Sequence, residues 1–227
     1  MPYFDKAWLN RVAAVLETLD DSPEKRMLQE ELNSLVENHG VIRSLVFSKK
    51  LCERLEQVLG KEQASDLLKK CSCNYPDEDI EDLKKIYERT QSVYEVHQSL
   101  KEKYEMELLS VHGLNQHELE IVQMNDWGNA GVLKDNQIVV TKVPHEFKAH
   151  FQATEKQLKA AYYCHCKRIK EGIKFGFELP VAYCDCGAGF YKHLWSTVLG
   201  QAVTVDQIQS ILNGDHVCQF VITLPKK

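Results

Sequence analysis

The chain has 227 residues, and its 28 basic side chains are outnumbered by 33 acidic ones, which gives a formal net charge of -5. General nucleic-acid binders and anionic-membrane binders need a basic surface, so this balance argues against both classes of partner. Residues 1–6 lack the apolar run of a secretion signal, and no later stretch approaches the roughly 20 apolar residues of a membrane span. We therefore expect a cytoplasmic protein. Its eight cysteines would be reduced and would serve packing, metal ligation or thiol chemistry.

Residues 1–118 have the pattern of several amphipathic helices. Apolar side chains recur at intervals of three and four between Val12 and Leu19, which is the spacing of one helix face. Asp21-Ser22-Pro23 has the chemistry of a helix start, because a capping side chain precedes a proline at the first helical position. His39-Gly40 is typical of a helix end.

Residues 71–76 interrupt the helical pattern and predict a loop between helices. The acidic run Asp77-Glu78-Asp79 follows and would lie at the positive end of the next helix. Apolar residues keep helical spacing through the polar stretch 79–109, so its many charges are expected to form a solvated face.

The pattern changes to strands near Trp127-Gly128. Two short apolar runs within residues 131–140 flank a polar tetrapeptide, which predicts a hairpin. Residues 145–157 predict one or two short helices. Ala161 to Cys166 is expected to be a strand, and Val181 to Cys186 a second strand, because Pro180 restarts the chain in extended form.

The last segment predicts a helix followed by a second hairpin. Gly187-Ala188-Gly189 would open the helix, and Gly200 would end it. Asn213-Gly214-Asp215 predicts the turn of the hairpin, and residues 218–224 predict a strand whose even-numbered side chains share one apolar face. The apolar parity slips near Asp206-Gln207, where we expect a bulge.

These elements predict an α+β protein. A helical region over residues 1–118 would pack on a cysteine-rich ligand-binding domain over residues 119–227, whose sheet is mainly antiparallel and is accompanied by helices. A chain of this length can bury a core without disulfide bonds.

Two Cys-x-Cys triplets, Cys164-His165-Cys166 and Cys184-Asp185-Cys186, hold half of the eight cysteines. In a strand each triplet would turn two sulfurs to one face and its middle residue to the other, which makes His165 and Asp185 second-choice ligands. Four thiolates around a tetrahedral ion predict a zinc site, with iron as the second choice. Two alternatives stay open, namely packing as small hydrophobes and redox or nucleophilic chemistry. The predicted metal ligands are Cys164, Cys166, Cys184 and Cys186.

Aromatic residues flank the triplets and predict either the wall of a pocket or part of the core. The glycines at 187 and 189 predict an anion-binding helix start or a tight turn. Cys218 is expected to be buried beside the pocket, Cys52 to pack within a helix, and the role of the pair Cys71 and Cys73 is left open. Of nine histidines, His145 and His150 are singled out because they precede the cysteine region. The predicted pocket residues are Tyr163, Tyr183, Gly187, Gly189, Tyr191, Trp195 and Cys218.

The runs 163–166, 183–192 and 210–220 resemble a family of bacterial and archaeal proteins for which no reaction is established, and the likeness extends upstream to 71–76 and 127–128. More remotely, the ending Gly214-Asp215-x-x-Cys218-x-Phe220 resembles the close of 2-aminothiazoline-4-carboxylate hydrolase-like proteins and of 4-vinyl-reductase-type ligand-binding domains. These resemblances imply an α+β domain that binds a small molecule, with or without a metal. The Cys-x-Cys pairs depart from both remote families, so no catalytic residue is carried over.

The first functional hypothesis is a cytoplasmic small-molecule-binding or sensor-like protein with a cysteine-rich, metal-binding site. The alternative is a hydrolase of a small sulfur- or nitrogen-containing acid that uses a cysteine or a metal-activated water. A third hypothesis is a thiol switch, in which Cys-x-Cys pairs oxidise reversibly. The ligand and the oligomeric state, including a homodimer, are left open by the sequence.

Overall fold

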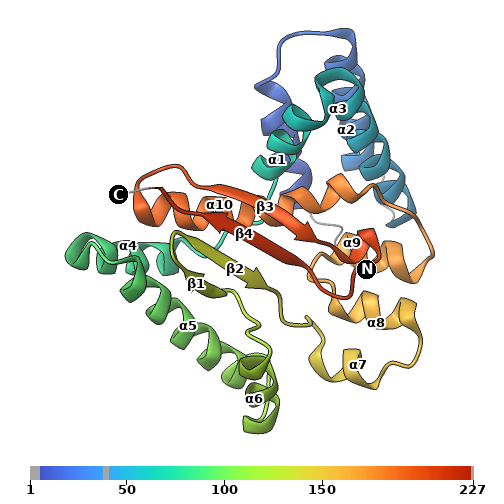
Figure 1. Ribbon diagram of the computed structural model, residues 1–227. Coiled ribbons are helices and arrows are strands. Elements are labelled where there is room, and N and C mark those ends of the chain that lie inside the picture. The colour runs from blue at the N-terminus through green and yellow to red at the C-terminus, as the bar shows by residue number, and fades with distance from the viewer. Residues whose placement is uncertain (1–5, 38–40, 226–227) are drawn as a thin grey trace.

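The computed structural model describes residues 6–37 and 41–225. The N-terminal helices form a lobe at one end of the molecule (Figure 1). The expected helix end at His39-Gly40 lies outside the described residues. The helices of this lobe are α1 (Lys6–Glu17), α2 (Pro23–Glu37) and α3 (Val41–Lys70), with a kink in α3 at Gly60.

A sheet of four antiparallel strands occupies the centre of the molecule, in the order β1-β2-β4-β3 (Figure 1). The strands are β1 (Val132–Lys134), β2 (Gln137–Thr141), β3 (Thr204–Gln209) and β4 (Gln219–Thr223). Around them are α4 (Asp77–Thr90), α5 (Val93–Ser110), α6 (Gln116–Met124), α7 (Phe147–Gln152), α8 (Lys156–Tyr163), α9 (Lys167–Lys174) and α10 (Asp185–Leu199). The fold is therefore α+β, as the sequence predicts.

Three local features that the sequence predicts are present in the structure. Asp135 takes a left-handed conformation, φ 54°, in the turn that closes the β1–β2 pair at Lys134 and Gln137. The register between β3 and β4 shifts between Gln207 and Gln209, which confirms a bulge one residue beyond the expected place. Gly200 ends α10 with φ 64°, as expected.

Two predicted strands are wrong. Residues 161–166 contain the end of α8 and a short extended link, and residues 181–186 form the 3₁₀-helix η1 (Val181–Cys184) and the first residues of α10. Short apolar runs do not distinguish a buried strand from one or two helical turns, and a proline such as Pro180 can precede either.

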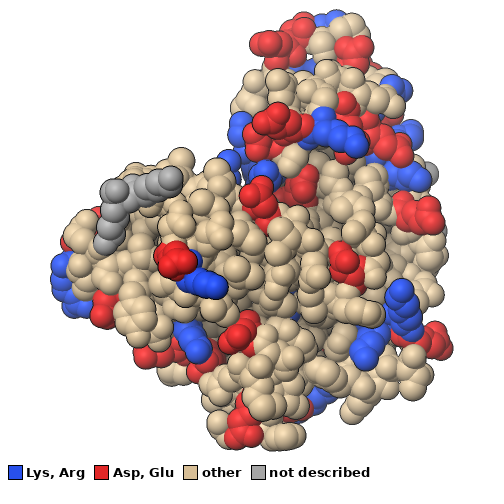
Figure 2. Space-filling model, in the orientation of Figure 1, with Lys and Arg blue, Asp and Glu red and all other residues tan. Residues whose placement is uncertain are grey.

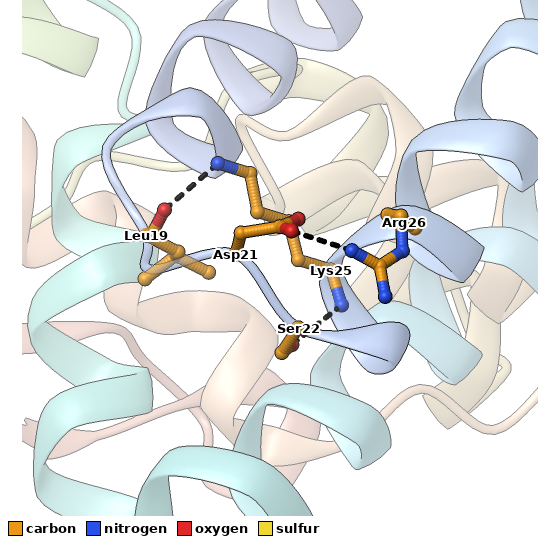
Figure 3. Close-up of polar contacts among 5 residues, drawn as sticks. All are labelled: Leu19, Asp21, Ser22, Lys25 and Arg26. Carbon is orange, nitrogen blue, oxygen red and sulfur yellow. Dashed lines mark hydrogen bonds and ion pairs between the residues drawn. The ribbon is translucent and has the colours of Figure 1, made fainter.

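The start of α2 shows how local chemistry sets a helix boundary. Ser22 Oγ accepts a hydrogen bond from the Lys25 amide at 3.0 Å, and Lys25 Nζ donates to the Leu19 carbonyl at 2.8 Å (Figure 3). Arg26 pairs with Asp21 at 2.5 Å. Acidic and basic side chains are interspersed over this lobe, whereas few charges lie over the visible face of the sheet (Figure 2).

The apolar core runs across the boundary expected at residue 118. One cluster joins α1, α2 and α3 to Ile169, Tyr183 and Cys184. A second cluster joins α4 and α5 to α10 and to the inner face of the sheet, which includes Ile138 and Phe220. Residues from both sides of position 118 therefore contribute side chains to each cluster, and the cysteine region lies between the two clusters. No helix within the described residues is long and apolar enough to cross a membrane.

Candidate functional site

Short helices position both Cys-x-Cys triplets. α8 ends just before Cys164, and α9 begins just after Cys166. Cys164 (φ -71°, ψ 128°) and Cys166 (φ -76°, ψ 113°) have extended backbone, so their side chains can face away from the residue between them. In the second triplet Cys184 ends η1, and Asp185 and Cys186 open α10.

The two triplets come together in space with Cys218, which directly precedes β4. Burial raises the pKa of the Cys164 thiol well above its usual range, and the nearby thiols of Cys166, Cys184 and Cys218 raise it further. Burial and then Cys166 raise the pKa of Cys186 to about 12. Sulfur atoms from three separate segments therefore lie within electrostatic range of one another. We call this group the thiol cluster; its members are Cys164, Cys166, Cys184, Cys186 and Cys218.

The environment of the thiol cluster favours protonated sulfur. Burial also raises the pKa of Cys184 and of Cys218, in both cases as the largest cause. Ser210 Oγ donates a hydrogen bond to Cys184 Sγ at 3.2 Å. A reactive cysteine needs a lowered pKa, because the thiolate is the nucleophile. The raised pKa of Cys218 therefore fits a buried packing role better than a catalytic one.

A buried cation lies beside the thiol cluster. The Arg168 guanidinium stands 4.1 Å from the centre of the Trp8 ring, and its Nε donates a short hydrogen bond to the Tyr183 hydroxyl. Arg168 lowers the pKa of Cys186, but this effect is smaller than those of burial and of Cys166. The positive charge of Arg168 therefore favours a thiolate at Cys186, but it does not outweigh the effect of burial.

The predicted metal ligands are neighbours but do not surround a common point. Among the described residues no three or more His, Cys, Asp or Glu side chains are arranged to hold a metal ion. The two second-choice ligands, His165 and Asp185, make their contacts outside the thiol cluster. Asp185 interacts with Ser65 and Lys69 of α3, and burial raises its pKa.

Two further cysteines border the thiol cluster, and a third lies next to one of them. Cys52 of α3 is fully buried, and burial followed by Cys186 raises its pKa. Cys73 is exposed, accepts a hydrogen bond from Arg11 Nη2 at 3.6 Å, and is close enough to Cys186 to raise the pKa of that thiol. Cys71 is buried, within electrostatic range of Cys52. The loop that the sequence left open therefore folds back to the edge of the thiol cluster.

The aromatic side chains of the predicted pocket are buried in the core. Tyr163 and Tyr183 are 1% exposed, and Tyr191 and Trp195 are 0% exposed. Trp195 Nε1 is the one buried side-chain nitrogen or oxygen among the described residues that lacks a hydrogen-bond partner. These rings support the fold around the cysteines, and Tyr163 also borders a cavity of about 390 Å³.

The Tyr163 hydroxyl joins three segments next to the thiol cluster. It donates to the Lys142 carbonyl at 2.6 Å and accepts from the Cys218 amide at 3.1 Å. The end of α8 is thereby linked to the ends of β2 and β4. Burial raises the pKa of Tyr163, so the hydroxyl stays protonated and keeps both roles.

The predicted glycine-rich turn lies inside α10, which begins at Asp185. A β-carbon on Gly187 would be 3.0 Å from Phe220 Cζ, and one on Gly189 would be 1.9 Å from the Lys69 carbonyl oxygen. These glycines let α10 approach the sheet and α3 closely, and they do not form a turn.

A cavity of about 350 Å³ that the sequence did not predict lies on the other side of the first triplet. We call it the His165 cavity. Its wall combines apolar groups with imidazoles, and His165 is the middle residue of the triplet whose sulfurs enter the thiol cluster. The lining residues used below are Leu108, His112, Leu114, Val143, His145, Phe147 and His165.

The backbone sets the tautomer of His165. Its Nε2 lies 2.6 Å from the Val143 carbonyl oxygen, which can only accept, so Nε2 carries the proton and Nδ1 keeps a lone pair. The His145 ring lies beside it, with the ring centroids 5.1 Å apart. Partial desolvation against the cavity wall is the largest cause that lowers the pKa of both imidazoles, followed by a neighbouring lysine in each case. His165 is nonetheless accessible to solvent, because it faces the cavity.

The sequence holds little signal for this cavity. His112, His145 and His165 are far apart in the chain, and only the fold brings them to one wall. Proximity to the cysteine region singled out His145, but it equally favoured His150, whose Nδ1 instead pairs with the Lys159 carbonyl at 2.9 Å.

Comparisons with protein-family models, curated proteins and solved structures find no match for this chain. The resemblances drawn from its motifs therefore stay predictions. The functional argument rests on the thiol cluster and the His165 cavity.

Proposed function

We propose that this chain is a small-molecule-binding, sensor-like protein, in which the His165 cavity takes the ligand and the thiol cluster is the responsive element. One observation carries the proposal. The triplet Cys164-His165-Cys166 contributes its imidazole to the cavity wall and its two sulfurs to the thiol cluster. A change at the sulfurs therefore moves a side chain that a bound ligand would touch.

The cavity wall suits a small ligand with an apolar body. Leu108, Leu114 and Phe147 supply apolar surface, and a volume of about 350 Å³ lies within the usual range for small-molecule sites. The neutral His165 presents Nδ1 as a hydrogen-bond acceptor, since its Nε2 proton is engaged by Val143. The favoured ligand therefore carries an N–H or O–H donor on a mainly apolar frame.

The thiol cluster is proposed to bind a thiophilic ion, zinc first and iron second. Thiols that raise one another's pKa would repel as thiolates, and a divalent cation removes that repulsion while releasing protons. The described arrangement is open, so binding would draw the sulfurs together. Movement of Cys164 and Cys166 would shift His165 between them, which gives the ion control over the cavity.

The hydrolase alternative draws less support. Raised thiol pKa values disfavour a cysteine nucleophile. The neutral pair His145 and His165 could act as a general base for a water in the cavity, and this is the observation that keeps the alternative.

Metal analysis of protein purified under reducing conditions without chelators tests whether the thiol cluster binds an ion. We expect about one zinc per chain, since four thiolates complete one tetrahedral shell. Cys164→Ser and Cys184→Ser should each lose it, and Cys52→Ala, which removes a buried cysteine outside the cluster, should retain it. Metal-free protein whose stability does not change when zinc is added would contradict this part of the proposal.

Ligand-observed and imidazole-detected NMR with a set of small apolar amines and alcohols tests the cavity. Compounds that bind should shift the ring signals of His145 and His165, and His165→Phe should abolish the effect because it removes the acceptor. His150→Phe is the matched control, since that ring lies outside the cavity. Binding that is unchanged in His165→Phe would place the ligand elsewhere.

A further inference from the structure

A second cavity, of about 470 Å³, lies between the last turn of α3 and one face of α10. We call it the lysine cleft. α3 contributes Lys69 and Lys70, and α10 contributes Lys192 and His193. The α10 residues that line the cleft recur at intervals of three and four and form a single helix face; they are Gly189, Lys192, His193, Ser196 and Thr197. Two walls far apart in sequence therefore present cationic groups to one space.

Gly189 creates this arrangement. A β-carbon there would overlap the backbone of Lys69, so the two helices touch where the cleft begins. Close contact places the lysines of α3 and α10 around the same cavity rather than on separate surfaces. The glycine is thus part of the construction of the cleft, as well as of the core.

The cleft has an excess of positive charge. Of the described residues that line it, Asp66 is the one acidic side chain, and it pairs with Lys69 at 3.4 Å. Within the part of the chain that the structure describes, Lys70 and Lys192 have no ion-pair partner. The last carbonyls of α3 carry partial negative charge, which its terminal lysines offset. Lys192, on the opposite wall, is therefore the decisive cation for an anionic ligand.

A hydroxyl at the wall of the cleft completes the site. Ser72 is 4% exposed and lines the cleft. Its amide bonds to the Lys69 carbonyl at 3.3 Å, but its hydroxyl makes no hydrogen bond to any described residue. This hydroxyl is not among the buried polar atoms that lack a partner, so it keeps accessible surface at the cleft and can donate to a ligand there.

We propose that the lysine cleft binds the phosphate monoester group of a small metabolite. The oxygens of the monoester accept from Lys70, Lys192 and the Ser72 hydroxyl, which together provide charge and one oriented donor. The cavity is larger than a phosphate ion requires, so the organic part of the molecule also fits within it. This site is separate from the His165 cavity and shares none of its lining residues.

Backbone-amide NMR titration of the full chain with glycerol phosphate, at constant ionic strength, tests the proposal. Signals at Ser72, Lys192 and their neighbours should shift together. Lys192→Gln should weaken binding by about tenfold, as expected for loss of one charged hydrogen bond. Lys134→Gln removes the same charge from the exposed end of β1 and should leave the affinity unchanged.

Three outcomes would overturn the proposal. Glycerol phosphate could shift no signal in the cleft, the two lysine variants could bind equally well, or sulfate could bind as tightly as the monoester, which would identify a non-selective anion site. Ser72→Ala provides a second variant that keeps every charge, and it should weaken the monoester while circular dichroism shows an unchanged fold. His165→Phe should bind glycerol phosphate normally, so failure of the His165 cavity proposal does not affect this one.

Discussion

Gly189 lies where α10 meets the end of α3, and the space there excludes even a methyl group. A β-carbon would stand 1.9 Å from the Lys69 carbonyl oxygen, which belongs to backbone and cannot turn away. Gly189→Ala should therefore lower the free energy of unfolding by about 3 kcal/mol, at the upper end of overpacking effects. Urea denaturation measures the change.

Gly172 in α9 is the matched control. A β-carbon there meets Leu179 Cδ1 and Leu45 Cδ2 at 3.4 Å, which is ordinary contact. Gly172→Ala should leave stability unchanged or raise it by about 0.5–1 kcal/mol, because alanine is the better helix former. Equal losses in the two variants would mean that the approach of α10 to α3 is not the cause.

The thiol cluster predicts a loss of stability in alkali. In the unfolded chain the thiols ionise from about pH 9, whereas the folded pKa values are raised, to about 12 for Cys186. The stabilisation is complete below the unfolded pKa and is lost as the pH rises toward the folded value, by up to about 1.4 kcal/mol per pH unit for each thiol. Urea titrations of the metal-free protein from pH 7 to 10 should show this fall, and Cys184→Ala should reduce its slope. A curve that stays flat to pH 10 would contradict the prediction.

For individual residues, the sequence predicts which side chains lie close together better than it predicts how they are arranged. Pairs of cysteines at one-residue spacing indicate that sulfurs gather, and the structure brings the two pairs together with Cys218. The direction of His165 could also be expected from the extended backbone of its neighbours. The cavity that it faces could not, because its other imidazoles are placed by segments distant in sequence.

Among the helices and strands, α2 offers a direct test of a boundary that the sequence predicts. Ser22 accepts from the Lys25 amide (Figure 3). Ser22→Ala should cost about 1 kcal/mol and Ser22→Gly only a few tenths, since glycine tolerates the cap conformation and leaves the amide to water. Thermal unfolding of the two variants distinguishes them. Identical losses would show that the hydroxyl does not act as the cap.

Elements bounded by specific turn chemistry are the ones that the sequence predicts well. The hairpin at Asp135 and the helix end at Gly200 depend on residues that accept a left-handed backbone. Residues 161–166 and 181–186 lack such signals. Their apolar side chains fit a strand or a helical turn equally, and only packing against α3 and the sheet decides between them.

For the molecule as a whole, the first apolar cluster predicts cooperative unfolding. Trp8 of α1 packs on Tyr183, with ring centroids 5.6 Å apart, and carries Arg168 over its face. The N-terminal lobe therefore shares its core with the cysteine region. Trp8→Ala should lower the free energy of unfolding by about 3–5 kcal/mol in one transition.

Far-UV and near-UV circular dichroism provide the measurement, and their unfolding curves should coincide. Trp127→Ala, at a half-buried position, should cost less. Two separate transitions in the wild-type protein would show instead that α1, α2 and α3 unfold independently of the rest.

Among the described residues the central sheet ends at β1 on one side and at β3 on the other, and both edge strands are poorly suited to pairing with another chain. The outer edge of β1 is three residues long and ends at Lys134, and β3 is broken by the irregularity that leaves Ile208 52% exposed. Short, charged or bulged edges discourage strands of a neighbouring molecule from adding to a sheet. Concentrated solutions of the folded protein should consequently resist fibril growth, and any self-association would use helical surfaces in place of backbone pairing.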